Sequence, residues 1–353
     1  MSRFRILSLD GGGIRGAFTA SFLAELECEI GTPIGRYFDL AAGTSTGGII
    51  ALAVALGEPA SRIVDFYRTA GPMIFTRQAP KRGWFRAIAR ALLARRLRHV
   101  GLAYDDLFQA RYDSAELRRA LQEVFGAKTL LDAKMHVLIP AVDLSRGSPV
   151  VFKTPHLPDA NSRDRSFLAV DIALATAAAP TYFPHAAIGP GSAYSDGGLW
   201  ANNPALVALA EVLRLRNSGT RDFDGVQVLS VGTGRGRYSL APPNGAGFAW
   251  WGPRLIDVMS LTQSEGTMRV AGFMLGELFQ RVDFDLPDNT WRLDSVEHLE
   301  QLIHYGREEA HRQLAPLRNW LFDGMAKETN WQFETRLAPL CPPGSHPSLK
   351  RRA

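Results

Sequence analysis

A serine at residue 45 lies in the pattern glycine-x-serine-x-glycine, formed by Gly43, Ser45 and Gly47. The apolar run from Ile49 to Leu56 follows this pentapeptide. The arrangement is typical of a nucleophile elbow, in which a strand ends, the chain bends sharply at the serine, and a helix begins. Glycines flank such a serine because a Cβ would clash with the crowded backbone. At a helix N-terminus, free N–H groups would favour negative charge that develops near Ser45.

A serine nucleophile needs a group that removes its proton, and the chain offers two kinds. None of the eight histidines lies in a context that marks a catalytic triad. Asp196, in contrast, follows a short predicted strand and precedes the pair Gly197 and Gly198, so its carboxylate could face Ser45. An ordinary Asx turn or a helix cap would have the same pattern, and Asp196 taken alone does not decide between these interpretations.

A glycine cluster near the N-terminus could supply the second requirement, donors for an oxyanion. Gly11–Gly13 follow the first predicted strand, and successive glycine N–H groups at a helix start form a concave donor site for an anion. Together with Gly16, the cluster also fits the G-x-G-x-x-G pattern of dinucleotide-binding folds. Arg15 would place a charge where that helix packs on its sheet, and no acidic residue stands clearly at the end of a second strand. An oxyanion loop is therefore favoured.

Strands and helices alternate along the chain and must position these groups. Apolar segments predict strands at residues 4–9, 135–144 and 226–231, and helices at residues 17–30, 167–178, 253–278 and 296–322. This alternation indicates an α/β fold with a mostly parallel sheet and helices on both faces. Ligands of such sheets bind at the carboxyl ends of the strands, where both glycine turns and Asp196 are expected.

Composition limits the class of protein. The 353 residues are 46% hydrophobic and 21% charged, which is enough for a sizeable core. The N-terminus lacks the apolar run of a secretory signal, and no stretch approaches the roughly 20 apolar residues that cross a bilayer, so a cytoplasmic protein is expected. The two cysteines, Cys28 and Cys341, do not indicate a disulfide scaffold or a cysteine-based zinc site.

Residues 71–100 carry many arginines and no acidic residue. A helical projection places Trp84 and its apolar neighbours on one side and most arginines on the other, until the pattern degrades after about residue 94. Such a segment suits either a membrane interface or a solvated surface helix. The net charge of +5 likewise suits an anionic partner such as lipid headgroups or a nucleotide, although an ordinary basic protein would show it too.

Three motifs together resemble the signatures of the patatin-like phospholipases, in the order which that family uses: Asp10–Gly16, Gly43–Gly47 and Asp196–Gly198. Three further blocks resemble its secondary motifs: Ala178–Pro184, Asn202–Pro204 and Ser230–Gly234. The resemblance covers roughly residues 4–235. It implies a patatin-like three-layer sandwich.

The resemblance also implies roles for these residues. Ser45 would be the nucleophile and Asp196 its proton acceptor, a dyad in place of a triad. The N–H groups of Gly11, Gly12 and Gly13 would bind the oxyanion, with Arg15 helping to hold the loop, and Gly43 and Gly47 would form the elbow. The reaction would be cleavage of fatty-acyl esters of membrane glycerophospholipids through an acyl-serine, with no metal or other cofactor.

Within this family the chain resembles bacterial anti-phage effectors that a cyclic dinucleotide activates. Expected partners are then a phospholipid membrane surface, a cyclic dinucleotide and further copies of the chain, but no DNA or RNA. The active enzyme would be peripheral to the inner membrane. Arginines at 71–100 or near Arg254, Arg269 and Arg281 are candidates for binding nucleotide phosphates.

Three alternatives stay open at this point. One is an ungated lipase or esterase of general lipid metabolism. The others are a nucleotide-binding oxidoreductase that uses Gly11–Gly16 and a non-catalytic binding module. The expected organisation is a catalytic domain at residues 1–235 with a basic insert near 71–100, a helical extension at 236–340 packed on the same domain, and a disordered tail at 341–353.

Overall fold

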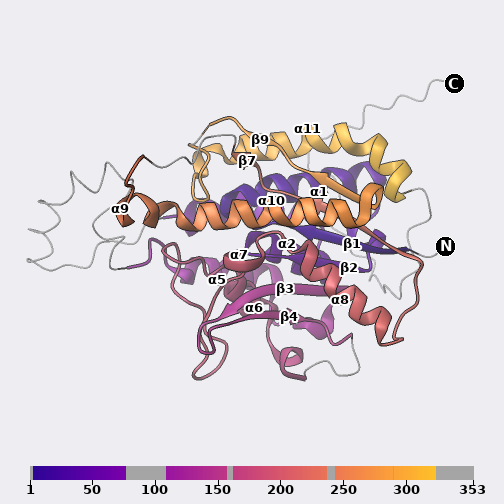
Figure 1. Cartoon of the computed structure of the whole chain (residues 1–353), viewed down its shortest axis with the longest axis horizontal. Helices are drawn as coiled ribbons and strands as arrows, with labels where there is room; N and C mark the ends of the chain where they lie inside the picture. Colours follow the sequence, from indigo (N-terminus) through magenta and orange to yellow (C-terminus); the bar gives the residue numbers. More distant parts are fainter. Residues whose placement is uncertain (1–2, 77–108, 157–161, 237–242, 289, 323–353) are drawn as a thin grey trace, which may run out of the picture.

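The computed structural model describes residues 3–76, 109–156, 162–236, 243–288 and 290–322 (Figure 1). Most of the predicted basic segment at 71–100 and the whole predicted tail lie outside these residues. Within them, no helix combines the length and apolarity that crossing a bilayer requires.

A seven-stranded sheet forms the centre of the molecule, in the order β4-β3-β2-β1-β6-β8, with β5 paired to β3. The parallel strands are β1 (Arg3–Leu9), β2 (Leu40–Gly43), β3 (His136–Asp143), β6 (Gly225–Val231) and β8 (Phe279–Val282). Two strands run antiparallel to β3: β4 (Ser148–Lys153) and β5 (Tyr194–Asp196). Two short strands, β7 (Arg235–Gly236) and β9 (Asp285–Leu286), pair separately.

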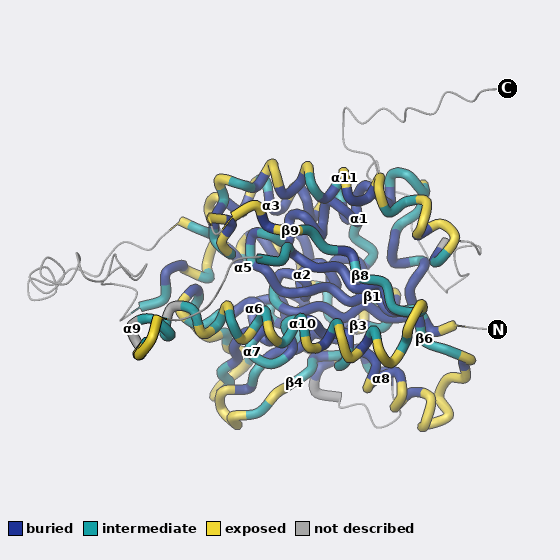
Figure 2. The backbone as a smooth tube through the Cα atoms, turned by 45° about the horizontal axis from the view of Figure 1, so that its top comes forward, coloured by how far each residue is buried: buried dark blue, intermediate teal, exposed yellow. Residues whose placement is uncertain are grey.

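Helices cover both faces of this sheet (Figures 1 and 2). One face is covered by α1 (Gly16–Ile30), α2 (Thr46–Ala55), α3 (Ala60–Ile74), α5 (Ser114–Phe125), α6 (Ala169–Ala177) and α11 (Leu299–Leu317). On the other lie α8 (Ala205–Asn217) and α10 (Leu255–Leu275), with the short α7 (Gly198–Ala201) and α9 (Phe248–Trp251) nearby. The predicted three-layer α/β sandwich is confirmed.

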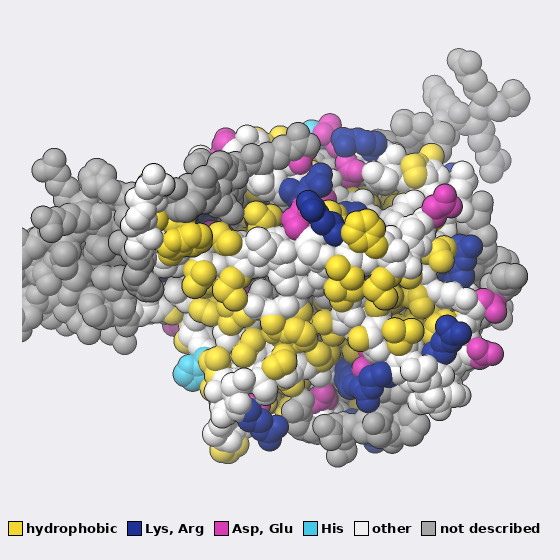
Figure 3. Space-filling view, viewed as in Figure 1, with side chains coloured by type: hydrophobic (Ala, Val, Ile, Leu, Met, Phe, Trp, Pro, Cys, Tyr) yellow, Lys and Arg dark blue, Asp and Glu magenta, His cyan; other side chains and the backbone are white. Residues whose placement is uncertain are grey.

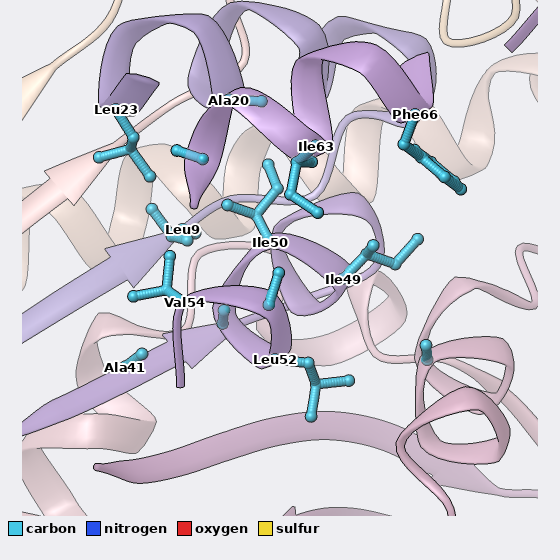
Figure 4. Close-up of a cluster of buried hydrophobic side chains, with 14 of the residues drawn as sticks. Leu9, Ala20, Leu23, Ala41, Ile49, Ile50, Leu52, Val54, Ile63 and Phe66 are labelled. Carbon is cyan, nitrogen blue, oxygen red and sulfur yellow. The ribbon is translucent and has the colours of Figure 1, made fainter. Parts of the chain in front are cut away.

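Side chains along each strand alternate between the two cores. In β1, Leu7 and Leu9 belong to the larger core beneath α1, α2 and α3, whereas Phe4 and Ile6 belong to the core beneath α8. Successive strand residues point to opposite faces, so a strand covered on both sides needs apolar residues toward both cores. Figure 4 shows the larger core, where Leu9 lies near side chains of the overlying helices such as Ile50 and Ile63.

The C-terminal part of the chain contributes more than the predicted helices. Strand β8 pairs with β6 and extends the central sheet, which the expectation of a helical extension did not include. The segment before α10 also contains the short helix α9. The domain boundary at residue 235 stays a prediction.

A glycine allows α11 to pack closely on α1. A Cβ at Gly306 would lie 2.4 Å from the carbonyl oxygen of Phe18 and 2.9 Å from the Cβ of Ser21. This contact joins residues that lie near the two ends of the chain. A substitution at Gly306 can therefore test whether α11 and α1 belong to the same folding unit.

We expect Gly306→Ala to lower the thermal unfolding midpoint. Alanine stabilises a helix by about 1 kcal/mol relative to glycine, but overpacking at this contact costs about 1–3 kcal/mol and should outweigh that gain. Gly266→Ala is the matched control, since Gly266 lies in α10 with open space where the Cβ would be. The control should unfold at the same or a slightly higher temperature. Equal midpoints for both variants would show that α11 does not depend on this contact.

Candidate active site

Ser45 lies at the sharp turn between β2 and α2. Its backbone has φ 54° and ψ −123°, a left-handed conformation that costs a non-glycine residue on the order of 1–3 kcal/mol. The Ser45 N–H donates to Oγ1 of Thr176 at 2.9 Å, and the Thr176 hydroxyl donates to the carbonyl of Pro140 at 2.6 Å. These bonds from α6 and β3 stabilise the turn and leave the Ser45 side chain partly exposed.

The two glycines of the elbow are required by close backbone contacts. A Cβ at Gly43 would lie 2.1 Å from the carbonyl oxygen of Gly47. A Cβ at Gly47 would lie 2.3 Å from the carbonyl oxygen of Leu9 and 2.5 Å from that of Asp10. The elbow therefore presses against the end of β1, where the glycine cluster begins.

Asp196 at the end of β5 accepts a hydrogen bond from the Ser45 side chain. It also accepts one from the N–H of Gly198 at 2.7 Å. Its side chain is buried, and burial raises the pKa of Asp196 to about 6, although both hydrogen bonds act in the opposite direction. A carboxylate with a raised pKa is a stronger base than an exposed one, which suits it to accept the serine proton.

The glycine cluster lies against Ser45, since a Cβ at Gly11 would be 3.3 Å from the Ser45 Cβ. The Gly11 N–H already donates to the carbonyl of Asn202 at 3.0 Å, so it is less suited to an oxyanion than expected. Among the described residues, the N–H groups of Gly12 and Gly13 have no acceptor. These two are the donors that the loop can offer.

Neighbouring groups hold the glycine loop in place. The hydroxyl of Thr233 donates to the carbonyl of Gly11 at 2.9 Å, and a Cβ at Gly12 would lie 2.2 Å from that hydroxyl oxygen. Nε of Arg15 donates to the carbonyl of Gly12 at 3.5 Å, and its supporting role stays a prediction.

A cavity of about 580 Å³ brings these groups together. Its lining includes Ser45, Asp196 and the loop Gly11–Gly13. One part of the lining is apolar and comes mainly from α3, α5 and the loop after α6: Phe66, Tyr67, Ile74, Leu117 and Phe183. Helix α10 adds the acidic Asp257 and Glu265, and six arginines line other parts of the cavity: Arg15, Arg111, Arg235, Arg254, Arg281 and Arg292. The cavity thus offers both apolar and cationic surface to a ligand.

Several supporting residues had not been predicted. Asn202 and Thr233 lie inside motifs that the sequence already singled out, so their neighbourhood was a usable signal. Thr176 had no such signal, since a threonine in an apolar helix is unremarkable in the sequence. Arg281 was a candidate for binding a nucleotide, but its guanidinium is bonded to Asp10 and Asp283, which corrects that hypothesis.

The other two nucleotide-site candidates have different surroundings. Arg254 lies over the ring of Trp250, 4.7 Å from its centroid, and lines the cavity. Arg269 is exposed on α10. Among the described residues, the group that could hold a metal ion is Glu25, Glu29 and His311, and none of these three lines the cavity.

Comparison with known proteins agrees with the motifs. The family model of the patatin-like phospholipases matches residues 7–209. A cGAMP-activated phospholipase of Vibrio cholerae is 44% identical over 260 residues, which cover 70% of this chain and 68% of that protein. Proteins with the same name from Escherichia coli and Pseudomonas aeruginosa are 42% and 37% identical, over 68% and 79% of this chain and 65% and 78% of their own lengths. The chain therefore belongs to the patatin-like phospholipase family.

Proposed function

We propose that this protein is a phospholipase of A type, a hydrolase that cleaves fatty-acyl esters of membrane glycerophospholipids. The observation that carries the proposal is that Ser45, the buried Asp196 and the donor loop line one cavity, with the Ser45 side chain close enough to Asp196 to affect its pKa. Membership of the patatin-like phospholipase family and the names of the relatives support the same reaction.

In this mechanism, the Ser45 Oγ attacks the acyl carbonyl carbon while Asp196 accepts the serine proton. The N–H groups of Gly12 and Gly13 donate to the oxyanion of the tetrahedral intermediate. Collapse breaks the ester bond, and Asp196 returns the proton to the departing lysophospholipid alcohol. Water then attacks acyl-Ser45 with Asp196 as base, which releases the fatty acid and regenerates the serine.

The cavity lining supports a substrate with two chemically different parts. The apolar side chains from α3 and α5 suit an acyl chain, because burying it there removes apolar surface from water. Arginines such as Arg15 and Arg292 suit the phosphate, since charge-assisted bonds to phosphate are the strong ones. This arrangement favours a glycerophospholipid over a neutral glycerolipid.

A lipid surface fits the outer side of α10. Five large apolar side chains of this helix are exposed, and Figure 3 shows apolar side chains gathered on the face where α10 lies: Leu255, Met259, Val270, Phe273 and Met274. Contiguous exposed apolar surface is typical of sites that bind a membrane or another protein. We therefore propose that the enzyme acts from the cytoplasm on the inner membrane surface.

Activation by a cyclic dinucleotide, in anti-phage defence, is the regulatory part of the proposal. It is supported by the three relatives whose names describe cGAMP-activated phospholipases. An ungated lipase is the alternative. No cofactor beyond such an activator is proposed for the chemistry, and assembly of several copies would be one route from nucleotide binding to activity.

The dyad predicts that Ser45→Ala and Asp196→Asn each lower fatty-acid release from phospholipid vesicles by a factor on the order of 1,000 or more. Asp196→Asn should stay folded, because the amide has the same shape and burial disfavours the original charge. Ser145→Ala and Asp222→Asn are matched controls on the exposed surface and should keep wild-type rates. Wild-type release by Ser45→Ala would refute the mechanism.

The pKa of Asp196 predicts the pH dependence. Only the carboxylate accepts the serine proton, so kcat/KM should rise with pH through about 6 and fall about tenfold per pH unit below it. Hydrolysis of a soluble p-nitrophenyl ester between pH 4.5 and 8 measures this, with circular dichroism at each pH to separate unfolding from titration. A profile that stays flat down to pH 4.5 would exclude Asp196 as the base.

Gating predicts that cGAMP raises vesicle hydrolysis by about 5- to 150-fold, the usual range of allosteric coupling. The linear dinucleotide of the same bases serves as control and should have little effect. Equal rates with and without cGAMP, together with no heat of binding in calorimetry, would favour the ungated lipase.

A further inference from the structure

A buried cluster of charged side chains connects the C-terminal part of the chain to the start of the glycine loop. Arg281 on β8 donates to both carboxylate oxygens of Asp10, at 2.9 and 2.7 Å. The same guanidinium donates to Asp283 at 2.7 Å and to the hydroxyl of Ser230 at 2.7 Å. A single side chain therefore joins the ends of β1, β6 and β8.

The cluster is placed to control both loops beside Ser45. Asp10 immediately precedes Gly11, and its N–H donates to the carbonyl of Val231 at 3.1 Å. Asp283 accepts the N–H of Gly234 at 2.9 Å. Between these two points, Thr233 donates to the carbonyl of Gly11. The glycine loop and the loop at residues 232–234 are thus held by the same guanidinium, one from each side.

Burial makes this contact sensitive to the shape of the cation. The Arg281 side chain is 14% exposed, and the side chains of Asp10 and Asp283 are 3% exposed each. Burial disfavours the charge on Arg281, but the two carboxylates outweigh this effect and raise its pKa. A Cβ at Gly232 would lie 2.2 Å from a carboxylate oxygen of Asp283 and 2.5 Å from a guanidinium nitrogen of Arg281, so the cluster has no room to relax there.

We propose that Arg281 is a positioning residue for the oxyanion loop, which acts through Asp10 to hold the N–H groups of Gly12 and Gly13 against Ser45. The proposal rests on the proposed function, because it assumes that this loop binds the oxyanion. Arg281 lies outside residues 7–209, the part that matches the family model. It gives the C-terminal part of the chain a role in the reaction in addition to its role in the fold.

A second ion pair offers a control for plain loss of stability. Arg221 donates to Asp39 at 2.8 Å, and the Asp39 side chain is 1% exposed. Asp39 immediately precedes β2, and its carboxylate accepts the N–H of Arg5, so this pair also joins elements of the central sheet. It lies at the ends of the strands opposite to Ser45, and neither residue lines the cavity. Arg221→Met should therefore lower stability with little effect on the chemistry.

The test compares Arg281→Lys and Arg281→Met with Arg221→Met. Wild-type protein should react with a fluorophosphonate and Ser45→Ala should not, which establishes the nucleophile before the variants are interpreted. In Arg281→Met the labelling rate and the kcat for a soluble ester should fall about 10- to 100-fold with KM nearly unchanged, since losing one oxyanion donor costs about 100- to 1,000-fold. Arg281→Lys should be intermediate, because an ammonium lacks the planar fork that bonds Asp10 in a bidentate way.

Asp10→Asn completes the experiment and covers the case in which Arg281→Met does not fold. If Arg281 acts through Asp10, the double variant Asp10→Asn with Arg281→Lys should be no slower than the slower single variant, since residues that act as a unit are not additive. The proposal would be overturned if the rate losses of the two single variants multiplied in the double variant, or if the Arg281 variants were labelled at the wild-type rate. An equal loss of kcat in Arg221→Met would also overturn it.

Discussion

The close approach of the elbow to the end of β1 is the constraint on which the site depends. No side chain fits at Gly47, because the carbonyl oxygens of Leu9 and Asp10 occupy the place of its Cβ. This contact brings Ser45 beside the loop that begins at Gly11, although more than thirty residues separate them in the chain. Parallel pairing of β1 and β2 makes it possible, since both strands end at the same edge of the sheet.

Burial suits Asp196 to its proposed role as the base. An exposed aspartate is too weak a base to accept a proton from serine readily, but Asp196 is shielded at the end of β5, and its pKa is raised. Antiparallel pairing with β3 holds β5 at the same sheet edge, where α6 also approaches through Thr176. The left-handed backbone of Ser45 is thus stabilised by the elements that position its base.

The C-terminal segment completes this sheet edge. Strand β8 adds to the sheet beside β6, and α11 packs on α1, the helix that follows the glycine loop. Arg281 on β8 then connects this segment to Asp10, at the start of the glycine loop, through a hydrogen bond. The charge on Arg281 is stable despite its burial, because the two carboxylates beside it outweigh the cost of removing it from water. The glycine loop near the N-terminus is therefore supported from both ends of the chain.

The sequence alone predicted the layered fold, and it singled out Ser45 and Asp196 as the candidate dyad. Apolar runs separated by glycine turns can be recognised without coordinates, and the motifs around Ser45 and Asp196 have a distinctive order. Only the tertiary structure showed that the Gly11 N–H is engaged, which leaves Gly12 and Gly13 as donors. It also assigned Arg281 to Asp10, because a pair separated by 271 positions in the chain has no local pattern. Neighbouring residues determine local turns and burial preferences, whereas contacts between strand ends depend on how the whole sheet is assembled.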